Sequence, residues 1–201
     1  MSQRNSGFRR KKLDDYPTPP WVTEALLPHL PARVRTIWEP AAGSGQMARV
    51  LKQAGYAVRA SDISQGIDFL DEEFAGFDCD AIVTNPPHDK AKVRPFIERA
   101  LHFTKPSGAV AMLFRTDCDH AKWRRHLFGR CPQFAKKLVL TERIVWFAGP
   151  KADPSENHAW FIWDWKHHGP PVLAYWQPDP EHLQAPRPPS RRQSAPLHNP
   201  G

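Results

Sequence analysis

The sequence predicts an α/β fold in which helices flank a mainly parallel central sheet. The middle of the chain alternates short apolar runs with amphipathic stretches, and short connections join them. This alternation is typical of strand–helix–strand units. Two of the runs, AIV and AVAMLF, carry no polar residue, as expected for parallel strands that are buried on both faces.

The elements of the N-terminal half follow from local signals. Two prolines precede a predicted helix over Trp21–Leu27, because proline is tolerated in a first helical turn. Thr36–Glu39 is a short apolar strand that a proline ends. Ser44–Ala54 has its apolar residues at helical spacing and stops before a glycine, so it reads as a helix. Ala57–Ile63 is predicted as the second strand.

The remaining elements continue the alternation. Cys79–Thr84 (CDAIVT) is a buried strand, and Lys90–Phe103 is an amphipathic helix with a proline in its first turns. Gly108–Phe114 is a further apolar strand, and His120–Phe128 is predicted as a short basic helix. The last predicted strands are Leu138–Thr141 and Ala159–Trp165.

A chain of 201 residues is short enough for one domain with tails. We expect a basic flexible arm over residues 1–13, a single domain over 14–176 and a proline-rich disordered tail over 177–201. Twenty-eight Lys and Arg against 21 Asp and Glu give a net charge of +7, which favours a polyanionic partner. Five of the basic residues lie in the first 12 positions, so a solvated, solubilising arm is an equal alternative.

Several classes of protein are excluded by what the sequence lacks. No apolar run is long enough to span a membrane, and no apolar stretch follows the basic N-terminus as in a secretory signal. The three cysteines have no paired spacing, which fits reduced thiols in a cytoplasmic protein. Histidines such as His158 and His167 invite a metal interpretation, but no C-x-x-C or H-E-x-x-H pattern exists, so no metal site is expected.

A glycine-containing turn follows the first predicted strand. Ligands of parallel sheets bind beyond the carboxyl ends of the strands, where this turn, EPAAGSG, lies. No lysine follows the glycines as in a phosphate loop, and the third glycine of the dinucleotide fingerprint is missing. Taken alone, such a turn is more often an ordinary strand–helix connection. A second acid, Asp62, ends the next strand and suits a ribose diol.

The turn resembles the first motif of S-adenosylmethionine-dependent methyltransferases, and more narrowly of the amino-methyltransferases that modify nucleic acids. The resemblance implies a Rossmann-like class I methyltransferase fold with S-adenosylmethionine as cofactor. It implies that the turn holds the methionine part of the cofactor and that the acid after the second strand holds the ribose. The residues so implicated are Glu39, Ala41, Gly43, Gly45 and Asp62.

Two further segments extend this resemblance. Asp68 and Phe69 resemble the segment that contacts the cofactor's adenine, the alternative being a loop acid beside a core aromatic. The segment DYPTPPW resembles the element that closes over the methionine end, which implicates Tyr16 and Thr18. Its alternative is a helix start without a ligand.

The tetrapeptide Asn85-Pro86-Pro87-His88 follows a buried strand and carries the chemistry. An exocyclic amine on a base is a poor nucleophile, because its lone pair is delocalised into the ring. The side-chain oxygen of Asn85 and the carbonyl of Pro86 offer acceptors for both amine hydrogens. The nitrogen then gains tetrahedral character, so catalysis is mostly positioning and electrostatics.

The tetrapeptide resembles the Asn-Pro-Pro-aromatic motif of adenine and glutamine amino-methyltransferases, in which Asn85 is expected to contact the cofactor as well. His88 departs from that motif, which usually has Tyr, Phe or Trp stacked on the flipped base. Imidazole is planar and can stack, but with a smaller face. The resemblance implies catalytic roles for the residues of this tetrapeptide, Asn85, Pro86, Pro87 and His88.

The leading hypothesis is a methyltransferase acting on the N6 amine of adenine in DNA. One alternative keeps the fold but methylates RNA adenine or a protein glutamine, and another is a nucleic-acid-binding relative with little catalysis. The basic stretch 122–126 and Arg115 are equally well explained as phosphate contacts or as a solvated surface. Little chain remains for target recognition, so sequence choice comes from short loops, the two tails or a protein partner.

Overall fold

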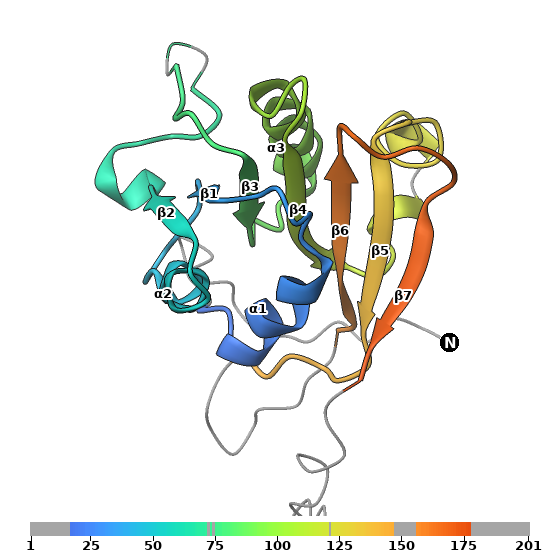
Figure 1. Ribbon diagram of the computed structural model, residues 1–201, viewed down its shortest axis with the longest axis horizontal. Coiled ribbons are helices and arrows are strands. Elements are labelled where there is room, and N and C mark those ends of the chain that lie inside the picture. The colour runs from blue at the N-terminus through green and yellow to red at the C-terminus, as the bar shows by residue number, and fades with distance from the viewer. Residues whose placement is uncertain (1–16, 72, 74, 121, 147–155, 178–201) are drawn as a thin grey trace, which may run out of the picture.

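The computed structural model describes residues 17–71, 73, 75–120, 122–146 and 156–177. The predicted arm and almost all of the predicted tail lie outside these residues. Seven strands form one sheet in the order β2-β1-β3-β4-β6-β5-β7 (Figure 1). Their bounds are β1 Thr36–Glu39, β2 Ala57–Ala60, β3 Ala81–Thr84, β4 Ala109–Arg115, β5 Phe134–Leu140, β6 His158–Asp164 and β7 Val172–Trp176.

The mainly parallel sheet predicted from the sequence is confirmed, with one exception. The pairs β1–β2, β1–β3, β3–β4 and β5–β7 are parallel, whereas β6 runs antiparallel to both of its neighbours. In Figure 1 the β6 arrow points up while the β5 and β7 arrows point down. As a result, His158 at the start of β6 pairs with Arg115 at the end of β4.

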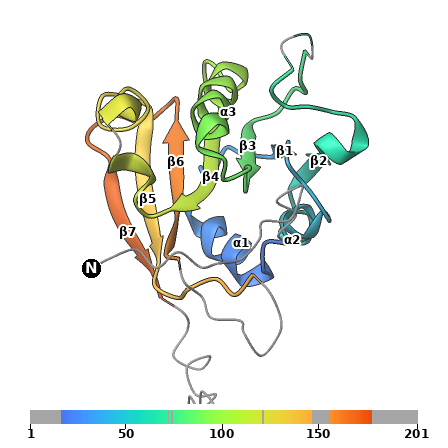
Figure 2. The same cartoon turned by 180° about the vertical axis from the view of Figure 1, so that it is seen from behind.

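Helices cover both faces of this sheet (Figures 1 and 2). The helices α1 (Pro20–Leu26) and α2 (Gln46–Gln53) bury their apolar side chains in one core cluster. The helix α3 (Lys90–Phe103) buries its side chains in the cluster on the other face. Among the described residues, no helix is long and apolar enough to cross a membrane.

Most predicted elements are present with shifted ends. The helix over Lys90–Phe103 is confirmed with the same bounds, including Pro95 in its interior. The second strand ends at Ala60, because a 3₁₀ turn over Ile63–Gln65 follows it. The strand β7 was not expected at all.

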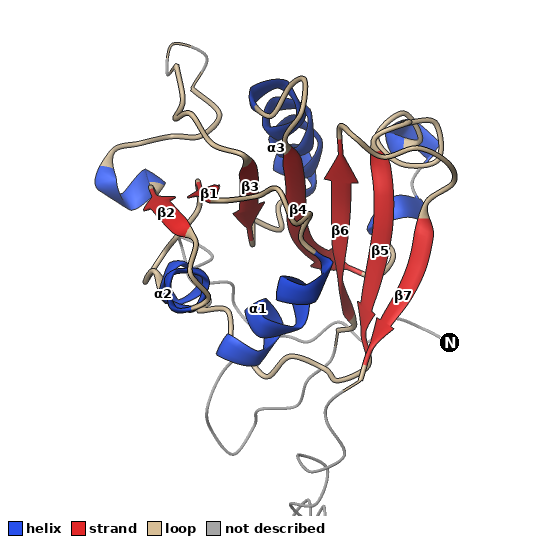
Figure 3. Cartoon of the chain, in the orientation of Figure 1, coloured by secondary structure: helices blue, strands red, loops and turns tan. Residues whose placement is uncertain are grey.

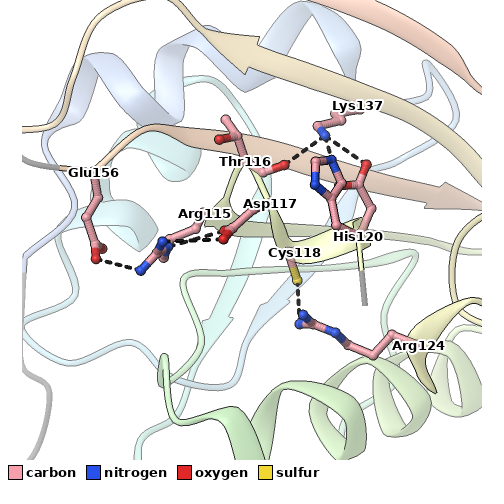
Figure 4. A network of polar contacts seen from close by, with 9 residues as sticks. Arg115, Thr116, Asp117, Cys118, His120, Arg124, Lys137 and Glu156 are labelled. Carbon is pink, nitrogen blue, oxygen red and sulfur yellow. Dashed lines mark hydrogen bonds and ion pairs between the residues drawn. The ribbon is translucent and has the colours of Figure 1, made fainter. Parts of the chain in front are cut away.

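The strand β5 is longer than predicted because its lysine side chains find partners. Lys137 Nζ donates to the carbonyl of Thr116 at 2.8 Å and lies 2.8 Å from Asp119 Oδ2 (Figure 4). Lys136 Nζ lies 3.2 Å from His29 Nδ1. These contacts allow two charged residues in the middle of a paired strand.

The predicted basic helix over His120–Phe128 is wrong. Two 3₁₀ turns, Cys118–His120 and Lys122–Arg124, lie on either side of residue 121, and further turns follow (Figure 3). Like charges three and four residues apart destabilise an α-helix. Tertiary contacts hold the turns instead, because Trp163 Nε1 donates to the carbonyl of Leu127.

Candidate active site

The candidate site lies at the carboxyl edge of the sheet, as expected for a parallel α/β fold. Glu39 is the last residue of β1, Thr84 is the last of β3, and Arg115 is the last of β4. The glycine turn follows the first of these, and the tetrapeptide follows the second. Neighbouring strand ends therefore bring the two predicted motifs to the same edge.

The glycine turn has a backbone that few other residues could adopt. Gly43 and Gly45 have φ angles of 48° and 73°, in the left-handed region that favours glycine. The N–H of Gly43 donates to Asp62 Oδ2 at 2.8 Å, while the N–H of Ser64 donates to Asp62 Oδ1 at 2.8 Å. Burial acts to raise the pKa of Asp62, but the hydrogen bonds from Ser64 and Gly43 outweigh it and lower the pKa below its ordinary value. An ionised Asp62 thus ties the end of β2 to the turn.

Glu39 is a buried acid without full hydrogen bonding. Its side chain is 2% exposed, and Oε2 has no partner within the described part of the chain. Burial raises its pKa to about 8, the nearby charge of Asp62 adds to this, and the Ala48 backbone and Arg49 oppose it. A cationic group of a ligand at the turn would satisfy this carboxylate, as the ammonium of the cofactor's methionine part would. The residues present therefore fit S-adenosylmethionine.

Of the two residues predicted to contact the cofactor's adenine, Asp68 is exposed and Phe69 is buried. The Oδ1 of Asp68 accepts from the N–H of Leu70 at 2.9 Å. Phe69 is 2% exposed and packs edge-on against Trp38, with ring centroids 5.1 Å apart. This placement favours the alternative of a core aromatic for the Phe69 ring.

The predicted tetrapeptide is joined to the leading segment through Asn85. Its Nδ2 donates to Thr18 Oγ1 at 3.2 Å, and its Oδ1 lies 3.0 Å from His88 Nε2. Since an amide oxygen only accepts, the His88 Nε2–H is the donor in the second contact. The structure thus brings Thr18, Asn85 and His88 together, with Pro86 buried beside them. Tyr16 lies outside the described residues.

The helix α1 fixes the position of Thr18. Trp160 Nε1, from the middle of the sheet, donates to the carbonyl of Val22 at 2.8 Å. Trp21 stacks on Trp176 of β7, with ring centroids 4.9 Å apart. The tryptophans of this region therefore serve packing, and they anchor the start of α1, just after Thr18, beside the sheet.

Two residues beside His88, namely His158 and Trp146, come from the connection 142–158, which the resemblance to the amino-methyltransferases implies to lie near the target base. The rings of His158 and Trp146 lie 5.7 Å and 6.5 Å from the ring of His88, and 5.3 Å from each other. Neither residue was singled out as part of the site, and individually His158 was considered only as a metal ligand. Trp146 belongs to the long connection 142–158, whose residues 147–155 lie outside the described ones. In the described parts of the chain, no group of three or more His, Cys, Asp or Glu is placed to hold a metal ion.

The basic stretch after β4 lines an open depression of about 620 Å³. His126 Nε2 lies 3.1 Å from Glu98 of α3, so this depression lies beside α3. Trp123 is 51% exposed within it. The residues that line the depression are Lys122, Trp123, Arg125, His126 and Arg130. Arg115, by contrast, is engaged with Asp117 and Glu156 (Figure 4).

Comparison with known proteins identifies the fold. No family model matches the sequence, and no curated protein sequence is similar to it. A candidate class I S-adenosylmethionine-dependent methyltransferase from Listeria monocytogenes aligns with a TM-score of 0.55 at 16% identity, over 79% of this chain and 65% of that protein. A candidate RNA methyltransferase from Pyrococcus horikoshii aligns with a TM-score of 0.56 at 16% identity, over 79% of this chain and 91% of that one.

A third similar structure is a methyltransferase subunit of a type I restriction-modification system from Streptococcus thermophilus. It aligns with a TM-score of 0.50 at 15% identity, over 79% of this chain and 46% of that chain. The chain thus spans less than two thirds of the Listeria and Streptococcus proteins. Together these similarities show that the chain has the Rossmann-like class I methyltransferase fold.

Proposed function

We propose that the protein is an S-adenosylmethionine-dependent methyltransferase that acts on the N6 amine of adenine in DNA. The contact that carries this proposal is the one between Asn85 and His88. The Oδ1 of Asn85 accepts from a ring N–H at 3.0 Å, so it is already oriented toward a hydrogen-bond donor. A substrate amine is a donor of the same kind.

The cofactor would lie against the glycine turn. Gly43 and Gly45 give it close access to the backbone, Glu39 faces its ammonium group, and Asp62 faces its ribose. Thr18 closes the methionine end. When bound, S-adenosylmethionine supplies an electrophilic methyl group on a sulfonium.

The residues of the tetrapeptide act on the substrate amine. Asn85 Oδ1 takes one amine hydrogen and the Pro86 carbonyl takes the other, which directs the nitrogen lone pair away from both acceptors. The bond from Asn85 Nδ2 to Thr18 holds the amide in the orientation that this requires. His88 leaves Asn85 when the amine binds, and its ring becomes available to stack on the base.

Charge supports nucleic acid as the substrate over a protein glutamine. The chain has a net charge of +7, and the depression beside α3 gathers Lys122, Arg125 and Arg130 around an exposed tryptophan. One of the similar structures is a methyltransferase subunit of a type I restriction-modification system. RNA adenine shares the same amine and remains the alternative within this class.

Transfer of a tritiated methyl group tests the proposal. The protein is incubated with labelled cofactor and with separate DNA, RNA and protein fractions. We expect the label in DNA, and label confined to RNA or to protein would reassign the substrate. No transfer to any fraction would contradict the proposal as a whole.

The raised pKa of Glu39 leads to a prediction about pH. In the free protein Glu39 is protonated below about pH 8, and a cationic ligand favours its charged form, so binding releases a proton. Cofactor affinity is therefore expected to rise between about pH 6 and 8, by up to about tenfold per pH unit. Calorimetry across this pH range, in buffers of different ionisation enthalpy, measures the cofactor affinity and the number of protons released on binding. Glu39→Gln should abolish the dependence, and an equal slope in that variant would contradict the assignment.

The basic depression leads to a prediction about salt. If its side chains contact phosphates, replacing Lys122 and Arg125 together with alanine removes about two contacts. The slope of log affinity for duplex DNA against log salt should then fall by about 1.8. The matched control replaces the exposed Lys52 and Lys166, which lie on other elements. Equal losses of slope in both double variants would show that the effect is net charge alone.

A further inference from the structure

His158 is a buried polar side chain that the structure leaves unsatisfied. It is 1% exposed, and neither ring nitrogen has a hydrogen-bond partner among the described residues. Buried side-chain polar atoms nearly always have such a partner, so each exception needs an explanation. A purely structural position in this strand would be filled better by an apolar ring.

The surroundings keep this imidazole neutral. Burial, with help from the nearby charges of His88 and Arg115, lowers the pKa of His158 to about 3; the Glu156 backbone and Asp117 oppose this shift. Glu156 nevertheless makes no hydrogen bond of normal geometry with the ring. A neutral imidazole carries one N–H donor and one acceptor nitrogen. Both remain unused.

The backbone around His158 is held in place, so the ring does not reach solvent by a small shift of the chain. His158 pairs with Arg115 in the antiparallel ladder, and the N–H of Thr116 donates to the carbonyl of Asn157 at 3.0 Å. The Arg115 side chain binds Glu156 Oε1 at 2.8 Å (Figure 4). The unsatisfied ring is therefore fixed at the carboxyl edge.

His88 connects this ring to the proposed acceptor. Its Nε2 lies 3.0 Å from Asn85 Oδ1, while its ring centroid lies 5.7 Å from that of His158. A substrate amine that binds Asn85 displaces His88 from it. The His158 ring would then adjoin the position that the His88 ring has left.

We propose that His158 is a specificity-determining residue, whose imidazole N–H donates a hydrogen bond to a ring nitrogen of the base held by Asn85. This proposal rests on the proposed function and adds to it the atom of the base that the protein recognises. Adenine carries acceptor nitrogens, N1 and N7, on either side of its exocyclic amine. The base thus offers an amine donor next to a ring-nitrogen acceptor. The protein offers the complementary pair, the amide oxygen of Asn85 next to the imidazole N–H of His158. His158 thus selects amino-substituted bases with an adjacent ring-nitrogen acceptor.

Substrate analogues test this contact through the reaction. Three pools of DNA oligonucleotides are randomised in the same way. They differ only in the purine at the adenine positions, which is adenine, 1-deazaadenine or 7-deazaadenine. We expect the wild-type kcat/KM to fall about tenfold on one of the two analogues, because a donor is left unpaired. His158→Phe should lose about the same factor on adenine and show no further loss on that analogue. A full analogue penalty in His158→Phe, or no penalty in the wild type, would overturn the proposal.

Binding without methyl transfer provides a second test. Fluorescence anisotropy compares the adenine pool with a pool in which abasic sites replace every adenine. His158→Phe should remove most of the affinity difference between the pools and leave the salt dependence unchanged, and the exposed His102→Phe is the matched control. His158→Gln, which keeps a donor and an acceptor, should restore part of the difference.

The two tests separate the two proposals. Methylated DNA with the same analogue ratios in wild type and His158→Phe would refute the role of His158 and leave the proposed function standing. Adenine-dependent binding that needs His158, without methyl transfer by the wild type, would refute the proposed function and support His158. Binding with no dependence on adenine would overturn the role of His158.

Discussion

Replacing Asn85 with alanine is expected to lower the turnover of methyl transfer about 100- to 1000-fold, the usual cost of losing one preorganised hydrogen-bonding partner. The variant lacks the oxygen that takes one hydrogen of the substrate amine. The variant also loses the bond to Thr18, but the glycine turn, Glu39 and Asp62 are unchanged, so cofactor affinity should fall far less than turnover. Single-turnover kinetics with labelled cofactor measure the rate of methyl transfer, and calorimetry measures the cofactor affinity.

Asn157→Ala is the matched control for this variant. Asn157 is a second carboxamide at the carboxyl edge, but its Oδ1 accepts from Arg143 Nε at 3.0 Å. Its replacement is expected to leave turnover close to that of the wild type, because Asn157 is exposed and its side-chain oxygen already has a partner. An Asn85→Ala protein that stays active would refute the mechanism of amine activation.

Replacing Gly43 with valine is expected to lower cofactor affinity at least about tenfold, or about 1.4 kcal/mol. A branched side chain is strained at the Gly43 φ angle of 48°, and it would stand where the ligand approaches the backbone. The substitution also disturbs the N–H that donates to Asp62. Calorimetry with cofactor gives the affinity, and circular dichroism confirms that the fold is retained.

Gly55→Val separates the loss of the ligand contact from backbone strain. Gly55 has a φ of 93°, and among the described residues no heavy atom lies within 4 Å of the position a Cβ would take. Valine there suffers similar strain at the end of α2, away from the turn. A Gly55→Val protein with the same loss of affinity would show that strain, and not contact with the ligand, explains the Gly43 result.

The sequence predicted the elements whose signals are local. The helix over Lys90–Phe103 and the buried strand that ends at Thr84 have clear periodicity and clear stops. The strand β5 was predicted too short, because its lysines read as exposed; their partners come from distant segments of the chain. The edge strand β7 was missed, since two prolines precede it and most of its side chains are exposed.

In the candidate site, too, the sequence predicted what depends on local signals and missed what depends on contacts between distant segments. The turn residues and Asn85 could be placed at one edge from the sequence, because the carboxyl ends of parallel strands share that edge. The position of His158 at this edge could not be derived from the order of strands, because it depends on β6 running antiparallel, which brings the start of that strand to the same edge. The burial of Phe69 likewise follows from packing against Trp38 and not from its neighbours in the sequence.

Mass spectrometry of nucleosides tests the central claim most directly. DNA is incubated with the protein and with S-adenosylmethionine that carries a deuterated methyl group, and is then digested to nucleosides. The proposed function predicts deuterated N6-methyldeoxyadenosine with the wild type and its near absence with Asn85→Ala. Label on cytosine alone, or DNA that stays unlabelled while the protein binds the cofactor, would contradict it.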